Sequence, residues 1–276
     1  MINADKYVIV CGGFDNIRSQ DVRFLQEAAR FGPLCVVLWN DESLQSVMGK
    51  KAKFPQEERL YFLQAIRYVN RVYLTAQPSD SDALPLIKDL NSSMWIVRQN
   101  DDTTNMHDFC RINGLEYRVI KKDNLAGFPD DIKAEPCKTS RKKILVTGCY
   151  DWFHSGHVRF FEEVSELGDL YVVVGHDENV RTLKGQGHPM LSQEERRYMA
   201  QSIRYVKQAL ISTGHGWLDA EPEIRRIKPD IYAVNEDGDK PEKRKYCREH
   251  GIEYVVLKRL PKSGLPRRES TELRGF

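Results

Sequence analysis

The chain carries an internal repeat, and this repeat limits its fold more than any other feature of the sequence. Shifting the chain so that residue 22 lies on residue 158 aligns the segment VRF with an identical VRF. One inserted residue later, PQEERLYFLQAIRYV at 55–69 lies on SQEERRYMAQSIRYV at 192–206. Further on, FCRINGLEYRVIK lies on YCREHGIEYVVLK. A repeat of this length predicts that one fold is built twice in tandem.

Each copy alternates short apolar runs with amphipathic stretches. The runs KYVIVCGG and KKILVTGC are typical of strands buried on both faces. The stretch VRFFEEVSELG is typical of a helix that ends at Gly168, and Ser192 with Glu195 forms a capping-box pattern. This alternation predicts an α/β protein with two tandem Rossmann-like domains and mostly parallel sheets. We expect domains at 1–135 and 141–276, joined by the polar segment AGFPDDIKAEPCKTSRKK.

Composition narrows the classes of partner. The formal net charge of +2 gives no basic field for nucleic acid, and no apolar run approaches the roughly 20 residues that span a bilayer. The N-terminus shows no secretory pattern. The six cysteines contain no C-x-x-C pair, which is typical of reduced thiols rather than of a disulfide framework. We therefore expect a cytoplasmic protein without a membrane span or a nucleic-acid partner.

The two copies differ most in the turn after their first strand. The second copy reads YDWFHSGHVRF at 150–160, where the first reads FDNIRSQDVRF. His154 and His157 are three residues apart at an expected helix start, so both can face one ligand. Gly156 permits a close approach to the backbone, and the helix N-terminus favours an anion. A zinc site is not expected, because no third Cys or His follows at useful spacing.

The second copy resembles the cytidylyltransferase-like branch of the nucleotidyltransferase superfamily. The resemblance includes HxGH and the ordered text LYVVVGHDENVRTLKGQGHPMLSQEERRYMAQSIRYV, with its Lys-Gly loop, E-R helix and R-Y-V segment. GHGWLDAEPEIRRIKPDIYAV is similar to the stretch that follows in phosphocholine and phosphoethanolamine cytidylyltransferases. The tandem layout is similar to that of ethanolamine-phosphate cytidylyltransferase.

The resemblance implies CMP transfer from CTP to a small phosphate or phosphonate monoester, with release of pyrophosphate. It implies that His154 and His157 contact the triphosphate and stabilise the transition state, and that Lys184 closes over the α-phosphate. Mg²⁺ is expected with CTP. The further nucleotide-binding residues that it implies are Gly148, Tyr150, Asp151, Gly156, Arg204, Ser270 and Thr271.

Two assignments stay open at this point. The arginine before the Ser270-Thr271 pair is Arg259, Arg267 or Arg268, because the intervening loop is longer than in the family. The acceptor-binding candidates can equally be ordinary turn residues or, for Trp217, a packed side chain. These candidates are His176, Asp177, Trp217, Asn235 and Glu236.

At each position that the resemblance assigns to phosphate binding, the first copy has a different residue. Arg18 and Asp21 stand at the two histidine positions, Gln20 at the glycine position and Met48 at the lysine position. We therefore expect 1–135 to be a degenerate, non-catalytic domain. Two other functions compete with cytidylyl transfer: an adenylyltransferase that uses ATP on a sugar phosphate, and a CTP-sensing module without turnover. The acceptor is left open among phosphoethanolamine, phosphocholine, glycerol phosphate, a sugar phosphate and a hydroxyalkylphosphonate.

Both copies keep the R-Y-V segment near which related enzymes dimerise. We predict that the first domain replaces a partner subunit, which gives an intramolecular pseudo-dimer with or without further homodimerisation. Size-exclusion chromatography with light scattering, together with activity of an isolated 137–276 fragment, checks this prediction. A fully active and soluble isolated fragment would count against it.

Overall fold

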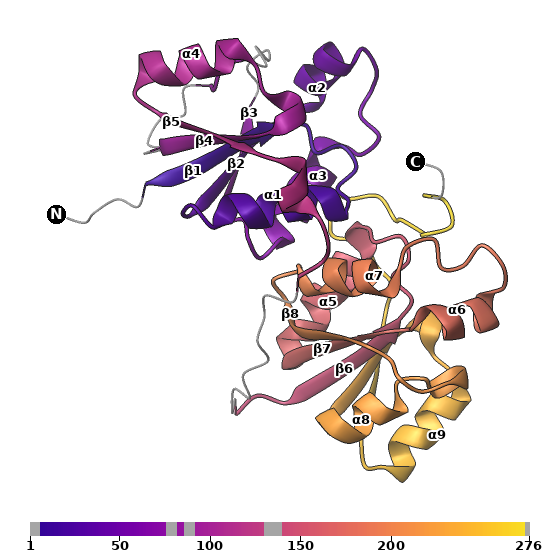
Figure 1. Cartoon of the computed structure of the whole chain (residues 1–276). Coiled ribbons are helices and arrows are strands. Elements are labelled where there is room, and N and C mark those ends of the chain that lie inside the picture. Colours follow the sequence, from indigo (N-terminus) through magenta and orange to yellow (C-terminus); the bar gives the residue numbers. More distant parts are fainter. Residues whose placement is uncertain (1–5, 76–81, 86–91, 130–139, 274–276) are drawn as a thin grey trace. The chain divides into compact units, whose positions relative to one another are not determined.

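The computed structural model describes residues 6–75, 82–85, 92–129 and 140–273. The chain divides into two compact units, residues 1–127 and 128–275 (Figure 1). Phe128 belongs to the second unit because its ring lies 5.6 Å from that of Tyr198 and its carbonyl accepts a hydrogen bond from Arg197. The division therefore falls before the boundary expected near 135–141. Residues 130–139 of the expected linker lie outside the described residues.

The first unit alternates strands and helices as its sequence pattern predicts. In chain order its elements are β1 (Tyr7–Gly12), α1 (Ser19–Ala29), β2 (Leu34–Trp39), α2 (Asp41–Met48), α3 (Gln56–Ala65), β3 (Arg71–Thr75), β4 (Ser92–Arg98), η1 (Gln99–Asp101), α4 (Thr104–Asn113), β5 (Glu116–Ile120) and η2 (Lys122–Leu125).

The second unit repeats this order and has one further described helix before its fourth strand. Its elements are β6 (Lys143–Gly148), α5 (Ser155–Leu167), β7 (Asp169–Val174), α6 (Asp177–Lys184), α7 (Gln193–Gln201), β8 (Val206–Ile211), η3 (Gly216–Leu218), α8 (Glu221–Ile227), β9 (Ile231–Asn235), η4 (Glu236–Gly238), α9 (Pro241–Glu249) and β10 (Glu253–Leu257).

Each unit contains one parallel five-stranded sheet. The strand orders are β3-β2-β1-β4-β5 and β10-β9-β6-β7-β8, which are the same order when the second is read backwards. All the strand pairs that the structure describes are parallel. The prediction of an α/β fold with two tandem Rossmann-like sheets is confirmed. Among the described residues, no helix is long and apolar enough to cross a membrane.

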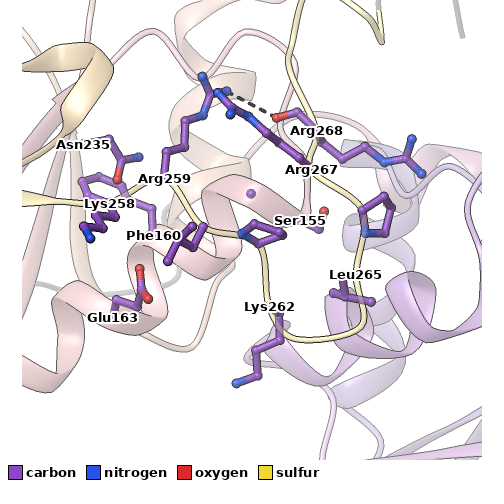
Figure 2. A pocket seen from close by; sticks show the side chains of 14 residues that line it. Ser155, Phe160, Glu163, Asn235, Lys258, Arg259, Lys262, Leu265, Arg267 and Arg268 are labelled. Atoms are coloured by element: carbon purple, nitrogen blue, oxygen red, sulfur yellow. Dashed lines mark hydrogen bonds between the residues drawn. The ribbon is translucent and has the colours of Figure 1, made fainter.

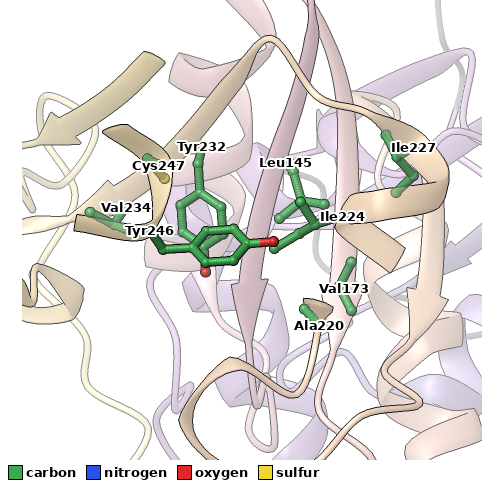
Figure 3. Close-up of a cluster of buried hydrophobic side chains, with 9 residues drawn as sticks. All are labelled: Leu145, Val173, Ala220, Ile224, Ile227, Tyr232, Val234, Tyr246 and Cys247. Atoms are coloured by element: carbon green, nitrogen blue, oxygen red, sulfur yellow. The ribbon is translucent and has the colours of Figure 1, made fainter. Parts of the chain in front are cut away.

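The central strands are buried on both faces because helices cover both faces of each sheet. In the second unit α5 and α7 lie on one face of the sheet, and α8 and α9 lie on the other (Figure 1). The core on the α8–α9 face joins these two helices to β6, β7 and β9 (Figure 3). Its buried members are Leu145, Val173, Ala220, Ile224, Ile227, Tyr232, Val234, Tyr246 and Cys247. Burial of this apolar surface is the main force that holds the layers together.

In the second unit, the sheet opens between β6 and β9 toward the carboxyl ends of the strands. The two strands pair only at Ile144–Ile231 and Leu145–Tyr232, although β6 continues to Gly148. The chain order also reverses between these strands, because β7 lies on one side of β6 and β9 on the other. In open α/β sheets, ligands bind at such a reversal, outside the carboxyl ends of the strands. The fold therefore places a crevice directly before α5.

Gly168 is predicted to be essential for the stability of the second unit. A Cβ at this position would collide with the carbonyl oxygen of Lys142, which also accepts the backbone N–H of Asp169. We expect Gly168→Ala to lower the free energy of unfolding by about 1–3 kcal/mol through overpacking. Urea denaturation measures the change. Gly238→Ala is the matched control, because its Cβ would meet nothing closer than 3.8 Å; equal effects of the two substitutions would contradict this prediction.

Candidate active site

The two histidines of HxGH cap the first turn of α5 reciprocally. His154 is the N-cap residue, and its Nδ1 accepts a hydrogen bond from the backbone N–H of Gly156 at 3.1 Å. The backbone N–H of His154 in turn donates to Nδ1 of His157 at 3.3 Å. The two rings stack, with centroids 3.9 Å apart. Both imidazoles are thus fixed by the backbone of the helix that they begin.

This capping determines which ring nitrogen carries the proton. A neutral imidazole has one donor and one acceptor nitrogen, and in both rings Nδ1 is the acceptor. Each Nε2 therefore carries the hydrogen and can act as a donor. Two such donors beside a helix N-terminus suit the oxygens of a phosphate.

Burial keeps His157 neutral. Desolvation lowers the pKa of His157 well below its ordinary value of 6.5, and electrostatic interactions with His154, Arg259 and Lys184 lower it further. His157 is consequently a neutral hydrogen-bond donor near pH 7 rather than a cation.

Aromatic side chains pack against the ring of His157. The ring of His157 lies 5.3 Å from that of Tyr150 and 5.2 Å from that of Phe153. Tyr150 has a left-handed backbone, with φ of 53°, and its ring covers Gly148 so closely that a Cβ there would lie 2.7 Å from it. Phe14, its counterpart in the first unit, has φ of 48°. Gly148 and Tyr150, both predicted to bind nucleotide, thus shape the turn that carries the histidines.

Gly156 is required by the position of His154. A Cβ on Gly156 would lie 2.9 Å from two atoms of the His154 ring. A larger side chain would therefore push this imidazole off the helix N-terminus. The sequence-based interpretation, that this glycine allows a close approach, applies here first to the protein's own histidine.

Two cations lie near enough to His157 for their charges to lower its pKa. One is Lys184, the last residue of α6, whose charge also lowers the pKa of Cys149 although burial leaves that pKa raised. The other is Arg259, whose guanidinium pairs with Asp237 at 2.9 Å. The same guanidinium donates to the carbonyl of Arg268 at 3.3 Å (Figure 2). Of the three arginines left open by the sequence, Arg259 is the one whose charge acts on this histidine.

A basic groove runs beside the start of α5 (Figure 2). The charged side chains that line it are Glu163, Lys258, Arg259, Lys262, Arg267 and Arg268. Five of these six side chains are cationic, so the groove favours an anion. Its volume is about 20 Å³, which leaves room for about one water molecule. The segment 258–268 therefore packs closely against α5.

The Ser-Thr pair at the end of the described chain lies near the HxGH turn. Ser270 donates its hydroxyl to the carbonyl of Trp152 at 3.2 Å, two residues before His154. Residues 270–273 form a turn, and the helix that TELR could begin is not seen within the described residues. The structure thus brings Ser270, which Thr271 follows in the chain, close to the HxGH turn.

Arg196 is a buried clamp that the sequence-based site assignment missed. Its side chain is fully buried and donates four close hydrogen bonds across the turns at the carboxyl edge of the sheet. The acceptors are the carbonyls of Leu191 (3.0 Å), Cys149 (2.7 Å) and Gly175 (2.7 Å) and the carboxylate of Asp177 (2.6 Å). This guanidinium therefore fixes the loops that surround the histidines.

The first unit contains the same clamp. Arg59 donates to the carbonyls of Phe54 (3.0 Å), Gly13 (2.5 Å) and Trp39 (2.9 Å) and to the carboxylate of Asp41 (2.7 Å). Each of these acceptors occupies the repeat position of an acceptor of the other arginine. Both copies carry an arginine at this repeat position, and this shared residue is the signal by which the sequence could have revealed the clamp. Because the copy without the two histidines retains it, the clamp belongs to the scaffold.

Asp151 also has a scaffold role that is repeated in both units. Its carboxylate accepts the backbone N–H groups of Met190 at 2.7 Å and Leu191 at 3.0 Å. In the first unit, Asp15 accepts the N–H of Lys53 at 2.8 Å and that of the next residue at 3.0 Å. Of the two roles considered for Asp151, the geometry favours shaping the turn over contacting the nucleotide.

Arg204 lies at the opposite edge of the sheet from the histidines. It precedes β8, whose first residue, Val206, pairs with Leu170 near the start of β7. His154 follows the end of β6, which runs parallel to both. A strand of six residues spans about 20 Å. Within the second unit, the exposed Arg204 therefore cannot share the crevice, and its assignment to the nucleotide is not supported there.

Two of the residues predicted to bind the acceptor substrate are held by hydrogen bonds within the protein. His176 uses Nε2 on the carbonyl of Gly214 at 2.8 Å and Nδ1 on the backbone N–H of Asn179 at 3.3 Å, so it acts as a helix cap. Asp177 is held by the arginine clamp described above. The ring of Trp217 is half exposed. These contacts give His176 and Asp177 structural roles.

Asn235 is the acceptor candidate that the structure brings into the groove. It ends β9 and lines the groove, and its buried Oδ1 has no hydrogen-bond partner among the described residues. Its neighbour Glu236 accepts the backbone N–H of Arg259 at 3.4 Å. Asn235 is therefore placed to contact a ligand, whereas Glu236 supports the arginine.

The first unit fills the histidine positions with a different pair. The backbone N–H of Arg18 donates to Asp21 at 2.8 Å, so Asp21 retains the capping role of His157. Arg98 of β4 then pairs with Asp21 at 2.6 Å. The helix start is thus preserved while both imidazole donors are lost.

Comparison with known proteins identifies the lineage of the chain. A family model described as cytidylyltransferase-like matches residues 145–260. FAD synthase of Thermococcus kodakarensis is 37% identical over 127 residues, which cover 45% of this chain and 83% of that protein. FAD synthase of Ferroglobus placidus is 35% identical over 120 residues, covering 42% and 75%. The bifunctional protein HldE of Campylobacter concisus is 34% identical over 166 residues, covering 60% of this chain and 34% of that protein.

The chain belongs to the cytidylyltransferase-like family. The resemblance drawn from HxGH and the text that follows it is thereby confirmed. As a member of this family, the protein is an enzyme of the nucleotidyltransferase type. The roles of its individual site residues remain predictions.

A neutral His157 predicts a specific pH dependence of stability for this family member. Above pH 6.5, His157 is neutral in both the folded and the unfolded chain. As the pH falls below 6.5, the unfolded chain binds a proton that the folded protein does not, so stability is lost. We expect His157→Asn to lose less stability than the wild type between pH 7 and pH 5, as measured by urea denaturation. Equal losses in the two proteins would contradict a buried neutral ring.

Proposed function

We propose that the second unit transfers the nucleotidyl group of a nucleoside triphosphate to a phosphate or phosphonate monoester. The single observation that carries this proposal is the pair of backbone-fixed imidazoles with their Nε2 donors beside a helix N-terminus. ATP is our leading nucleotide, because the relatives that the chain covers for more than two thirds of their length are FAD synthases. FAD contains an adenylyl group joined to a flavin phosphate, which is a phosphate monoester.

The reaction is an in-line displacement at the α-phosphorus. An oxygen of the acceptor phosphate forms a bond to this phosphorus, while the bond to the oxygen that bridges the α- and β-phosphates breaks. Pyrophosphate leaves with the bonding electrons, and no proton transfer from the acceptor is needed if its phosphate is ionised. Catalysis then depends on positioning and on stabilising negative charge.

The described residues supply these functions from several elements. His154 and His157 donate from Nε2 to phosphate oxygens at the start of α5. Lys184 at the end of α6 and Arg259 after β10 add positive charge to the same place, since both act on His157. The groove is narrow, so a triphosphate would displace the basic side chains of segment 258–268 and take over their contacts.

Mg²⁺ is expected to accompany the triphosphate. Among the described residues, no group of three or more His, Cys, Asp or Glu side chains could hold a metal ion. We therefore propose that phosphate oxygens and water, rather than a protein cage, provide most of its ligands. The ion would offset the charge of the triphosphate tail.

Cytidylyl transfer from CTP is the second candidate. The description of the family model and the text around the R-Y-V segment favour it. The basic groove and the imidazole pair suit the triphosphate of either nucleotide, so the choice depends on contacts to the base. Under this candidate, CTP and a small phosphate or phosphonate ester replace ATP and the flavin phosphate.

Pyrophosphate release tests the function and the nucleotide together. ATP and CTP are each incubated with Mg²⁺ and flavin mononucleotide, glycerol phosphate, phosphoethanolamine, phosphocholine, a sugar phosphate or a hydroxyalkylphosphonate. We expect turnover with ATP and one acceptor of this panel. Turnover with CTP alone would favour the second candidate. Tight binding of a nucleotide without turnover on any acceptor would indicate the sensing module instead.

His157→Ala is expected to lower kcat/KM by a factor of about 10²–10³, because one charge-stabilising donor is lost. Its matched control is Asp21→Ala, which removes the residue at the same helix position in the first unit. The control should retain wild-type turnover. Retained turnover in His157→Ala, with wild-type folding by circular dichroism, would exclude the proposed role of this histidine.

A further inference from the structure

A cavity in the first unit shows which residues of the second unit surround its crevice. This cavity has a volume of about 340 Å³, and its lining includes the last residues of β1, β2 and β4. Three further lining residues are Asp82, Trp95 and Met106. The residues at their repeat positions, 137 residues later in the chain, are Asp219, Tyr232 and Lys243. We therefore expect these three side chains on the α8–α9 side of the crevice.

Lys243 extends from α9 over the ring of Tyr232. Its Nζ lies 5.8 Å from the centroid of this ring and donates to the carbonyl of Gly238 at 3.2 Å. Tyr232 itself belongs to the core between the sheet and the α8–α9 layer (Figure 3). Burial, followed by the charge of Lys240, lowers the pKa of Lys243 below its ordinary value of 10.5. An ammonium has three donors, so the single hydrogen bond found among the described residues leaves two for a ligand.

Asp219 supplies a carboxylate to the same region. Its Oδ2 accepts the hydroxyl of Ser212 at 2.7 Å, and a Cβ on Gly175 would lie 3.2 Å from this oxygen. Gly175 follows β7, so Asp219 lies at the carboxyl ends of the strands. Its charge acts on Lys243, yet within the described part of the chain the two side chains form no ion pair. A group that both accepts and donates hydrogen bonds can therefore contact both.

A pair of hydroxyls completes this part of the crevice. Thr147 and Tyr232 share a hydrogen bond of 2.7 Å between their side-chain oxygens. Two hydroxyls carry two hydrogens, so one of them has no acceptor among the described residues. The region also adjoins the basic groove, because Asp237 acts on Lys243 and pairs with Arg259 at 2.9 Å. A substrate with its phosphate at Arg259 can thus place its tail beside Lys243.

We infer that Lys243 and Asp219 bind the tail of the acceptor substrate, and that this tail carries hydroxyl groups, as in a polyol phosphate or a sugar phosphate. A hydroxyl accepts from an ammonium and donates to a carboxylate at the same time. Lys243 would repel an ammonium tail, and Asp219 would repel a carboxylate tail. This inference rests on the proposed transferase activity, and it disfavours phosphoethanolamine and phosphocholine as acceptors. The ribityl phosphate of flavin mononucleotide belongs to the favoured class.

The two copies differ at this lysine as they differ at the histidines. The first unit has Met106 where the second has Lys243, and a methionine cannot donate a hydrogen bond. The ammonium is thus present in the copy that carries the imidazole pair.

Three phosphates with five-carbon tails test the inference on the full-length chain. Ribitol 5-phosphate is the hydroxylated probe, pentyl phosphate lacks the hydroxyls, and 5-aminopentyl phosphate carries an ammonium. Isothermal titration calorimetry measures each Kd with Mg²⁺ and the α,β-methylene analogue of ATP or CTP present, so that no transfer occurs. We expect ribitol 5-phosphate to bind about tenfold more tightly than pentyl phosphate. The aminopentyl ester should bind most weakly.

Substitutions then localise the binding of ribitol 5-phosphate. Lys243→Met introduces the residue of the first unit, and we expect it to raise this Kd about tenfold while the Kd of pentyl phosphate stays unchanged. Asp219→Asn keeps an acceptor for Ser212 and should raise the Kd about fivefold. Lys245→Met, at an exposed lysine of α9 that pairs with Glu249, is the matched control and should leave the Kd unchanged. Circular dichroism checks that each variant is folded.

Calorimetry without transfer keeps this inference and the transferase proposal distinguishable. Selective binding of ribitol 5-phosphate by a protein that turns over no acceptor would support the ligand assignment and contradict the transferase proposal. In an active enzyme, Lys243→Met should raise the KM of a hydroxylated acceptor and leave kcat and the KM of the nucleotide unchanged.

Three results would overturn the inference. One is equal binding of the three five-carbon probes, and another is an unchanged Kd of ribitol 5-phosphate in Lys243→Met. The third is tighter binding of O-phosphoserine than of ribitol 5-phosphate, because its carboxylate and ammonium would then match Lys243 and Asp219 better than hydroxyls do.

Discussion

The reciprocal capping of α5 by His154 and His157 is the interaction on which the candidate site depends. Capping groups satisfy backbone N–H donors that a helix start would otherwise leave without partners. Here the groups that perform this task are imidazoles, so the same hydrogen bonds that begin the helix also fix the ring tautomers. The same two side chains thus cap the helix and present the Nε2 donors of the candidate site. A substitution that damages one therefore affects the other.

The first unit shows what remains when this link is broken. Asp21 caps α1 as its counterpart caps α5, and Arg59 holds the loops with the same set of acceptors as Arg196. Framework contacts have persisted in both copies, whereas the imidazoles proposed to contact a ligand have changed. Comparing the two units thus distinguishes scaffold from chemistry without any other sequence. By this comparison Asp151, Asp177 and Arg196 are scaffold, and His154, His157 and Lys184 are the positions that differ.

Most of the fold was predictable from the sequence, because the repeat and the alternation of apolar runs with amphipathic stretches act over short range. The place of the histidines at a strand-to-helix turn was predictable for the same reason. The role of Arg196 was not, since its acceptors come from three separate turns that only the folded chain brings together. The distance between Arg204 and the histidines was not predictable, because motif order does not say at which edge of a parallel sheet a residue lies. That Arg259, among the three arginines, acts on His157 likewise depends on the geometry of the folded tail.

The two arginine clamps carry a consequence for how such a chain can evolve. Each guanidinium holds the surrounding turns together, and three of its four acceptors are main-chain carbonyls that side-chain replacement does not remove. Apart from the helix caps, the side chains that line the pocket are therefore not needed to hold the loops in place. Selection can then exchange them freely while the surrounding loops stay in register. A duplicated unit of this kind can therefore keep its fold while the side chains that line its pocket change.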